Sequence, residues 1–260
     1  MKALLFILIT ATGLWAQGRA GQAPAGPPPT PRAAAPIDLT GQWVSMIVDE
    51  WRFRVVPQKG DLPYLPLNAE ARRIANTWDP AKDETEGNAC KAYGAVGVMQ
   101  RPGRVRIAWE NDTTLKVEFD AGTQTRPLKF GAAPAEKGAP SWQGYSTAEW
   151  IVNGRPLLNL GLPNLNVRGG GPQSTRGGTL KVTTTNMKPG YLRKNGVPYS
   201  DRGVMTEYFN LVEGAQGEKY FAVTAMLDDP AYLNQPFIRT YTFKKESGTA
   251  GWEPTPCWNQ

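Results

Sequence analysis

The sequence of 260 residues contains no histidine. Histidine is the commonest general acid or base at neutral pH and the commonest metal ligand in proteins. Its absence excludes a Ser-His-Asp triad, a Cys-His dyad and an ordinary zinc site. Any acid-base chemistry would fall to Asp, Glu, Tyr, Lys or Arg side chains. The sequence therefore indicates neither a metal nor another cofactor.

Long apolar runs are also scarce, and the clearest one lies at the start of the chain. Lys2 is followed by about a dozen mostly apolar residues, and small residues, Ala16 and Ala20, come next. This pattern is typical of a secretory signal peptide, and the run is short for a membrane span. We assign residues 1–20 to a signal peptide and residues 21–36, rich in Pro and Ala, to an extended linker. The mature protein is expected to be exported, periplasmic or extracellular, with no stable membrane anchor.

Cysteine occurs only twice, as Cys90 and Cys257. Two cysteines in an exported chain favour one disulfide bond, which would fasten the Pro-rich C-terminal tail to the body of the protein. The alternative is a buried free thiol at one position and an exposed thiol in the tail.

Charge of one sign does not dominate either. The chain has 29 Lys and Arg against 23 Asp and Glu, a formal net charge of +6. We find no long basic run interleaved with aromatic residues, which nucleic-acid binding would favour. A mixed, solvated surface explains the charges, and we expect no nucleic-acid partner.

β-Branched and aromatic residues occur in short runs separated by Gly, Asp and Pro, which is the pattern of strands and turns. The clearest strands are residues 204–212, 220–227 and 237–245. The same pattern predicts strands at residues 43–48, 51–56, 104–110, 115–119, 123–130 and 179–185. A single helix is predicted from the N-cap Asn68 to Trp78, and a long loop at residues 186–200. The sequence thus predicts one all-β domain, residues 37–260, forming an antiparallel barrel with one packed helix.

Two resemblances accompany this pattern. Gly41-Gln42-Trp43, just before a strand, resembles the opening of lipocalins, which implies a barrel that holds one small apolar ligand. A second set of residues is similar to a set of exported bacterial β-domain proteins, which implies a single β domain and no particular activity. Its members are Asp79-Pro80, Cys90, Pro102-Gly103-Arg104, Trp142, Gly144-Tyr145-Ser146, Thr206-Glu207, Asp228-Asp229-Pro230 and Pro236-Phe237.

Aromatic residues are abundant, with nine Trp, nine Tyr and eight Phe. Some of them are expected to line a barrel cavity, with Tyr hydroxyls and one or two Arg side chains orienting the ligand. The leading hypothesis is therefore an exported protein that binds a small, partly apolar molecule. The candidate ligand-binding residues are Trp142, Tyr145, Trp150, Arg193, Tyr208 and Tyr241.

A second hypothesis is an isomerase, lyase or hydratase on the same barrel. Glu207 or an Asp would act as base, Tyr191 or Tyr199 as acid, and Arg239 would stabilise a developing oxyanion. A third hypothesis is an envelope scaffold, which a filled barrel interior would favour.

Overall fold

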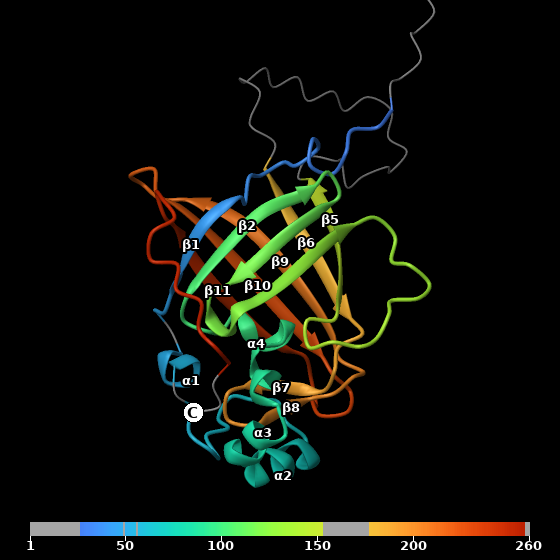
Figure 1. The fold of residues 1–260 in the computed structure, drawn as a ribbon, viewed down its shortest axis with the longest axis vertical. Coiled ribbons are helices and arrows are strands. Elements are labelled where there is room, and N and C mark those ends of the chain that lie inside the picture. The colour runs from blue at the N-terminus through green and yellow to red at the C-terminus, as the bar shows by residue number, and fades with distance from the viewer. Residues whose placement is uncertain (1–26, 49, 56, 153–176, 258–260) are drawn as a thin grey trace, which may run out of the picture.

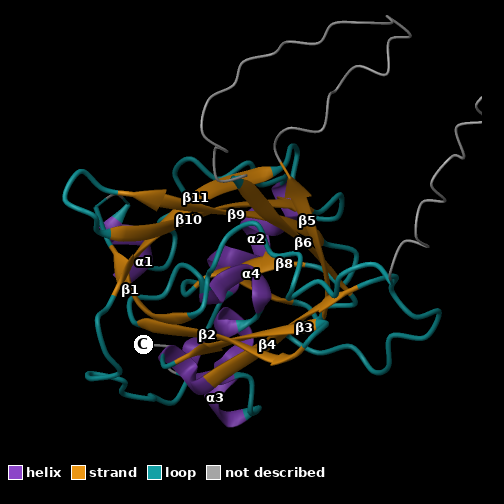
Figure 2. Ribbon diagram, turned by 90° about the horizontal axis from the view of Figure 1, so that it is seen from above, coloured by secondary structure: helices purple, strands orange, loops and turns teal. Residues whose placement is uncertain are grey.

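A computed structural model describes residues 27–48, 50–55, 57–152 and 177–257, in which nine strands close into a barrel (Figures 1 and 2). Around the barrel their order is β1-β11-β10-β9-β6-β5-β4-β3-β2. The strands are β1 (Gly41–Met46), β2 (Arg104–Asn111), β3 (Thr114–Phe119), β4 (Gln124–Phe130), β5 (Tyr145–Val152), β6 (Gly178–Thr185), β9 (Val204–Glu213), β10 (Lys219–Asp228) and β11 (Phe237–Lys245). The predicted all-β barrel is confirmed.

One strand pair departs from the predicted antiparallel arrangement. β4 and β5 run parallel, with Leu128 opposite Ser146 and Phe130 opposite Ala148, whereas the other barrel pairs are antiparallel. A parallel pair needs a connection that returns to the starting end, and residues 131–144 supply it. The barrel is therefore mixed rather than wholly antiparallel.

Aromatic rings pack the middle of the barrel. Phe221 lies 4.9 Å from Trp43, 6.1 Å from Phe209 and 4.6 Å from Phe243, measured between ring centroids. All four side chains are almost completely buried, and Trp43 Nε1 donates to the Leu39 carbonyl at 2.9 Å. Much of the aromatic content therefore serves the core, and these rings occupy the centre where a ligand cavity was expected.

Short helices and a hairpin cover one end of the barrel, which we call the capped end (Figure 1). In the described chain they are α1 (Trp51–Val55), α2 (Ala69–Thr77), α3 (Pro80–Thr85), α4 (Ala95–Val98), the 3₁₀ segments η1 (Ala89–Tyr93) and η2 (Ala121–Thr123), and the strands β7 (Gly190–Arg193) and β8 (Val197–Tyr199). The predicted helix is confirmed as α2, because the Asn68 side chain accepts from the Ala71 amide at 2.9 Å and caps its start. Ala71 and Ala75 are buried in a second apolar core.

Two predictions about this end are wrong. Residues 51–56 were expected to form a strand, but α1 follows a turn at Glu50, whose φ is +49° and whose carbonyl accepts from the Phe53 and Arg54 amides. The short run of alternating apolar and charged residues fitted either element, and burial of Phe53 and Arg54 favours the helix. Residues 186–200 were expected to form a loop, but they contain the β7–β8 hairpin.

The N-terminal end of the described chain lies against the barrel. Trp150 Nε1 donates to the Pro31 carbonyl at 2.8 Å, and the Arg32 amide donates to the Asp112 carbonyl at 3.1 Å. Pro31 and Arg32 belong to the Pro/Ala-rich segment 21–36. The signal peptide assigned to residues 1–20 lies outside the described residues. Within the described ranges, no helix has the length and hydropathy needed to cross a membrane.

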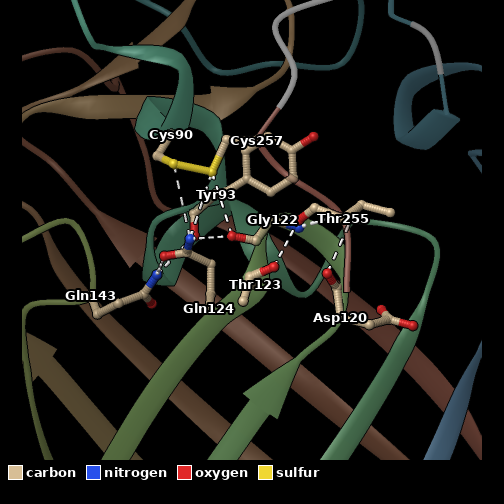
Figure 3. Close-up of a disulfide and its surroundings, with 9 residues drawn as sticks. All are labelled: Cys90, Tyr93, Asp120, Gly122, Thr123, Gln124, Gln143, Thr255 and Cys257. Atoms are coloured by element: carbon tan, nitrogen blue, oxygen red, sulfur yellow. Dashed lines mark hydrogen bonds between the residues drawn. A yellow bond between two sulfur atoms is a disulfide. The ribbon is translucent and has the colours of Figure 1, made fainter. Parts of the chain in front are cut away.

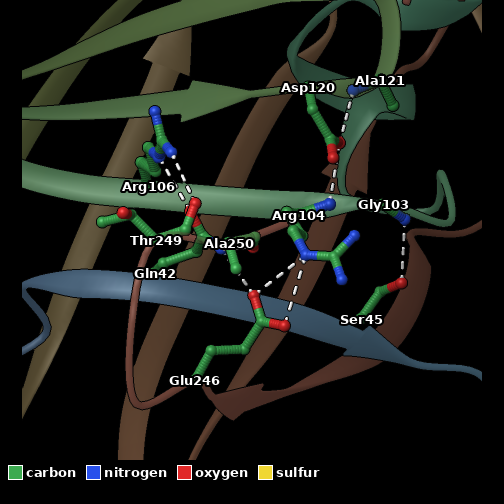
Figure 4. Close-up of polar contacts among 10 residues, drawn as sticks. All are labelled: Gln42, Ser45, Gly103, Arg104, Arg106, Asp120, Ala121, Glu246, Thr249 and Ala250. Carbon is green, nitrogen blue, oxygen red and sulfur yellow. Dashed lines mark hydrogen bonds and ion pairs between the residues drawn. The ribbon is translucent and has the colours of Figure 1, made fainter. Parts of the chain in front are cut away.

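The C-terminal tail is fastened to the barrel wall by polar contacts (Figure 4). Glu246 on the tail accepts from Arg104 Nε at 3.0 Å and from Gln42 Nε2 at 2.8 Å. The tail then reaches Cys257, which forms a disulfide with Cys90 on η1, with the Cα atoms 5.1 Å apart (Figure 3). The predicted disulfide is confirmed.

Gly196 in the β7–β8 turn gives a first test of the cap. Its φ is +77°, and an added Cβ would lie against the Trp78 ring. Gly196→Ala is expected to lower the free energy of unfolding by more than the roughly 1 kcal/mol that a left-handed non-glycine residue costs, because the ring must also move. Gly60 also has a φ of +77°, but an added Cβ there would meet open space. The loss of unfolding free energy in Gly60→Ala, measured by urea unfolding, therefore gives the backbone cost alone. Equal losses for the two variants would show that Trp78 does not constrain the turn.

Candidate functional site

Three arginine side chains are buried where the cap meets the barrel. Arg54 comes from α1, Arg101 follows α4, and Arg193 ends β7; their exposed fractions are 2%, 4% and 1%. Arginine is rarely buried without a carboxylate partner because removing its charge from water is costly. We call these three side chains the arginine cluster.

Backbone carbonyls and a ring hold Arg54 in place. Its Nε donates to the Gln100 carbonyl at 3.2 Å, and its Nη1 donates to the Met46 carbonyl at 3.1 Å. Its guanidinium carbon lies 5.4 Å from the centroid of the Tyr241 ring on β11. These contacts fix the position of the guanidinium group.

Arg193 lies over an aromatic ring beside a carboxylate. Its guanidinium carbon is 4.3 Å from the Phe53 ring centroid, and its Nη2 is 3.9 Å from Glu50 Oε1. Glu50 accepts its short hydrogen bond, 2.9 Å, from Arg239 Nε instead. Among the described residues, neither Nη1 nor Nη2 of Arg193 has a hydrogen-bond acceptor.

Arg101 has still fewer acceptors. Its Nε contacts the Gly97 carbonyl at 3.4 Å, and Nη1 and Nη2 are buried with no acceptor in the described part of the chain. Together Arg101 and Arg193 present four donor nitrogens that are removed from water and left unbonded. Unbonded buried donors are strongly destabilising, so this arrangement is suited to accepting a ligand.

The electrostatics of the arginine cluster agree with its geometry. Burial lowers the pKa of Arg101 to about 10, and the neighbouring Arg54 and Arg193 cations oppose its charge further. Burial also lowers the pKa of Arg193 to about 10, where the Glu50 carboxylate acts in the opposite direction. Lys194 has its pKa lowered to about 8 by burial and by Arg101. An acceptor with negative charge would relieve each of these effects.

Three of the residues predicted from the sequence meet here. Arg193 belongs to the arginine cluster, Tyr241 contacts Arg54, and Arg239 bonds to Glu50. Burial raises the pKa of Tyr241 above its ordinary value, so its hydroxyl stays protonated and available as a donor.

Glu207, the predicted base, has a different partner. Both of its carboxylate oxygens accept from Arg126 inside the barrel, at 3.0 and 2.6 Å, and both side chains are at most 1% exposed. Arg126 also donates to Thr184 Oγ1 at 3.2 Å. The structure therefore does not bring Glu207 and Arg239 together.

The two predicted acids also lie apart from each other. The Tyr191 hydroxyl donates to Asp83 Oδ2 at 2.7 Å in an open cavity of about 190 Å³ on the cap. The Tyr199 hydroxyl is buried with no hydrogen-bond partner among the described residues. Burial is the largest cause that raises the pKa of each phenol, so neither is activated as an acid near neutral pH.

The remaining predicted ligand-binding residues are scattered. Trp142 Nε1 donates to the Pro189 carbonyl at 3.3 Å, and Lys129 Nζ lies 4.9 Å from the centroid of the Tyr145 ring. Trp150 packs 5.3 Å from Phe130 and donates to Pro31. Tyr208 is half-buried on β9, between the buried Glu207 and Phe209, so it faces the outside of the barrel. Within the described part of the chain, these four side chains have different neighbours.

Sequence reasoning missed Arg54 and Arg101. Arg54 lies in a segment expected to be a strand, and Arg101 is separated by Gln100 from the apolar stretch Ala95–Met99. The closeness of Arg101 to that stretch is the one weak signal of its burial in the sequence.

No protein-family model, curated protein or solved structure matches the chain. The likeness to lipocalins therefore rests on Gly41-Gln42-Trp43 alone, although Trp43 does lie inside the barrel. Because a barrel by itself is compatible with many functions, the function has to be argued from the arginine cluster.

Proposed function

We propose that this is an exported protein that binds a small, partly apolar molecule at the capped end of its barrel. One observation supports the proposal: the Nη atoms of Arg101 and Arg193 are buried without an acceptor in the described chain. A ligand that accepts from them would replace the hydration they have lost, and the Phe53 and Tyr241 rings beside the arginine cluster would contact its apolar part.

The location of this site differs from that of a lipocalin ligand. The rings of Trp43, Phe209, Phe221 and Phe243 occupy the barrel centre, so the ligand would lie below them, between barrel and cap. The enzyme hypothesis relied on Glu207, Tyr191, Tyr199 and Arg239, which lie in separate surroundings. The filled barrel centre would suit the scaffold hypothesis, but a scaffold has no need for the buried, unbonded Nη atoms of Arg101 and Arg193. Ligand binding is therefore the function we propose. Export is part of the proposal and is supported by the N-terminal sequence and by the disulfide.

Native mass spectrometry of the full-length protein, purified without denaturation, tests the binding. We expect the mature chain to carry a small molecule that dissociates at higher collision energy. Arg101→Met should lose this molecule, and the exposed Arg202→Met should retain it. Wild-type protein that carries no small molecule, and takes up none when incubated with a metabolite extract, would contradict the proposal.

We expect Arg101→Met, which should lose binding, to be more stable than the ligand-free wild type. Arg101→Met removes a buried charge to which no carboxylate of the described residues is bonded, so the ligand-free protein should gain about 1–4 kcal/mol in free energy of unfolding. Urea unfolding after exhaustive dialysis measures the change, with Arg202→Met expected within about 0.5 kcal/mol of wild type. A clear loss of stability in Arg101→Met would show that Arg101 is structurally satisfied and is not kept for a ligand.

A further inference from the structure

We propose that the ligand carries a doubly charged oxyanion group, of the phosphate monoester or dicarboxylate type, bound by the guanidinium groups of Arg101 and Arg193. This inference rests on the proposed function and specifies the chemistry of the molecule bound. Phosphate monoesters and dicarboxylates share the property used here, which is two negative charges on oxygens spaced for guanidinium donors.

The first argument is the balance of charge. Arg101, Arg193 and Arg239 carry three positive charges at the site. Glu50 is hydrogen-bonded to Arg239 and lies 3.9 Å from Arg193, and Asp61 lies 2.8 Å from the exposed Arg52. Among the described residues, neither Arg101 nor Arg193 has a carboxylate at hydrogen-bond distance. Two negative charges on a ligand would match these two guanidinium groups, whereas a single charge would match only one of them.

The second argument is the shape of the donors. A guanidinium group offers parallel N–H donors that match two oxygens of a carboxylate or phosphate. Arg101 and Arg193 each present both Nη atoms unbonded. Arg54 is already engaged through Nε and Nη1 with carbonyl groups. We therefore assign direct contact to Arg101 and Arg193, and a supporting positive charge to Arg54.

Other charged groups in the described chain do not offer the same opportunity. Asp83 on the cap accepts from Trp78, Lys91 and Tyr191, so the cavity beside it is lined by satisfied groups. The Arg126–Glu207 pair compensates its own charge. The arginine cluster is the place where positive charge and unbonded donors coincide.

A series of benzene derivatives tests the charge directly. Phenyl phosphate and phthalate are dianions at pH 7.5, benzoate is a monoanion and benzyl alcohol is neutral. Titration calorimetry at constant ionic strength should give saturable binding for at least one dianion, with benzoate at least tenfold weaker and benzyl alcohol without measurable binding. The stronger of phenyl phosphate and phthalate identifies the phosphate or the dicarboxylate class.

Variants locate the binding. Losing one charged hydrogen-bond donor costs about 1.5–3 kcal/mol, or roughly 10- to 150-fold in affinity. Arg101→Met and Arg193→Met should each weaken dianion binding by about this factor, and Arg101→Lys, which keeps the charge but not the paired donors, by less. Arg202→Met should leave the affinity unchanged. Unchanged affinity in both Met variants would overturn the assignment to Arg101 and Arg193.

The dependence on pH gives a readout that a purely structural role would not produce. Lys194 lies half-buried with its Nζ 5.9 Å from the Tyr93 ring centroid, and burial and the charge of Arg101 both lower its pKa. A bound anion favours the protonated amine, so affinity for phenyl phosphate should be highest below pH 8 and fall as the pH rises further. Arg101, with a pKa of about 10, keeps its charge through this range. The decrease should be absent in Lys194→Met.

The two proposals fail in different ways. If benzoate or benzyl alcohol binds as tightly as the dianions, or if native mass spectrometry identifies a neutral or cationic ligand, the charge class is wrong and the binding function stands. If no probe binds and the protein carries and takes up no small molecule, the proposed function fails and the class with it.

Discussion

Glu207→Gln is expected to lower the free energy of unfolding by about 3–5 kcal/mol, because it leaves the buried Arg126 guanidinium without its counter-charge. Both side chains are at most 1% exposed, and two hydrogen bonds of 3.0 and 2.6 Å join them. Glutamine keeps the shape of the side chain, so the loss measures charge rather than packing. Urea unfolding monitored by tryptophan fluorescence gives the difference.

Two control variants test whether the loss of stability comes from the burial of the ion pair or from the loss of any ion pair. Glu149→Gln breaks an ion pair with Lys181 that is also short, 2.8 Å, but Glu149 is 63% exposed. We expect this variant to lower the free energy of unfolding by at most about 1 kcal/mol. The double variant Arg126→Leu/Glu207→Leu removes both charges and should recover most of the stability lost by Glu207→Gln. A Glu207→Gln effect as small as that of Glu149→Gln would show that the barrel interior is hydrated at this point.

The strands were predictable because their two faces have different surroundings. Along β10, Phe221, Val223 and Leu227 face the core, and the residues between them are more exposed, so the period of two is visible in the letters. The parallel placement of β5 beside β4 was not predictable. It depends on where residues 131–144 return along the barrel, and this stretch carries no apolar period that would fix its path.

The site was predictable only in part. The sequence predicts Arg193, Arg239 and Tyr241 as site residues, and all three lie at or beside the arginine cluster. It does not indicate Arg54 or Arg101, because strand and core patterns depend on apolar residues and an arginine is usually exposed. The abundance of aromatic residues pointed to Trp142, Tyr145 and Trp150, which pack in separate places. The residue type alone does not distinguish an aromatic ring that contacts a ligand from one that packs in the core.

Replacing Cys90 and Cys257 together by Ser is expected to lower the free energy of unfolding by about 4–5 kcal/mol, since the bond closes a loop of sequence separation 167 and so restricts the unfolded chain. Denaturation of wild-type protein with and without reductant provides the matched measurement. If the free energies of unfolding of the double variant and of the reduced wild type both lie within about 1 kcal/mol of that of the oxidised protein, the polar contacts of the tail are sufficient and the disulfide adds little stability.

The same double variant should also weaken dianion binding, because Cys90 lies on η1, which continues through α4 to Arg101. Near the bond, Thr123 Oγ1 donates to the Thr255 carbonyl at 2.9 Å, and the Thr255 amide donates to the Asp120 carbonyl at 2.9 Å (Figure 3). Thr123→Ala, which removes one of these contacts and keeps the disulfide, is the control and should bind phenyl phosphate as wild type does. Unchanged affinity in a folded Cys90→Ser/Cys257→Ser protein would show that α4 holds Arg101 in place independently of the tail. A loss confined to the cysteine variant would link the proposed ligand binding to the oxidised state of the protein.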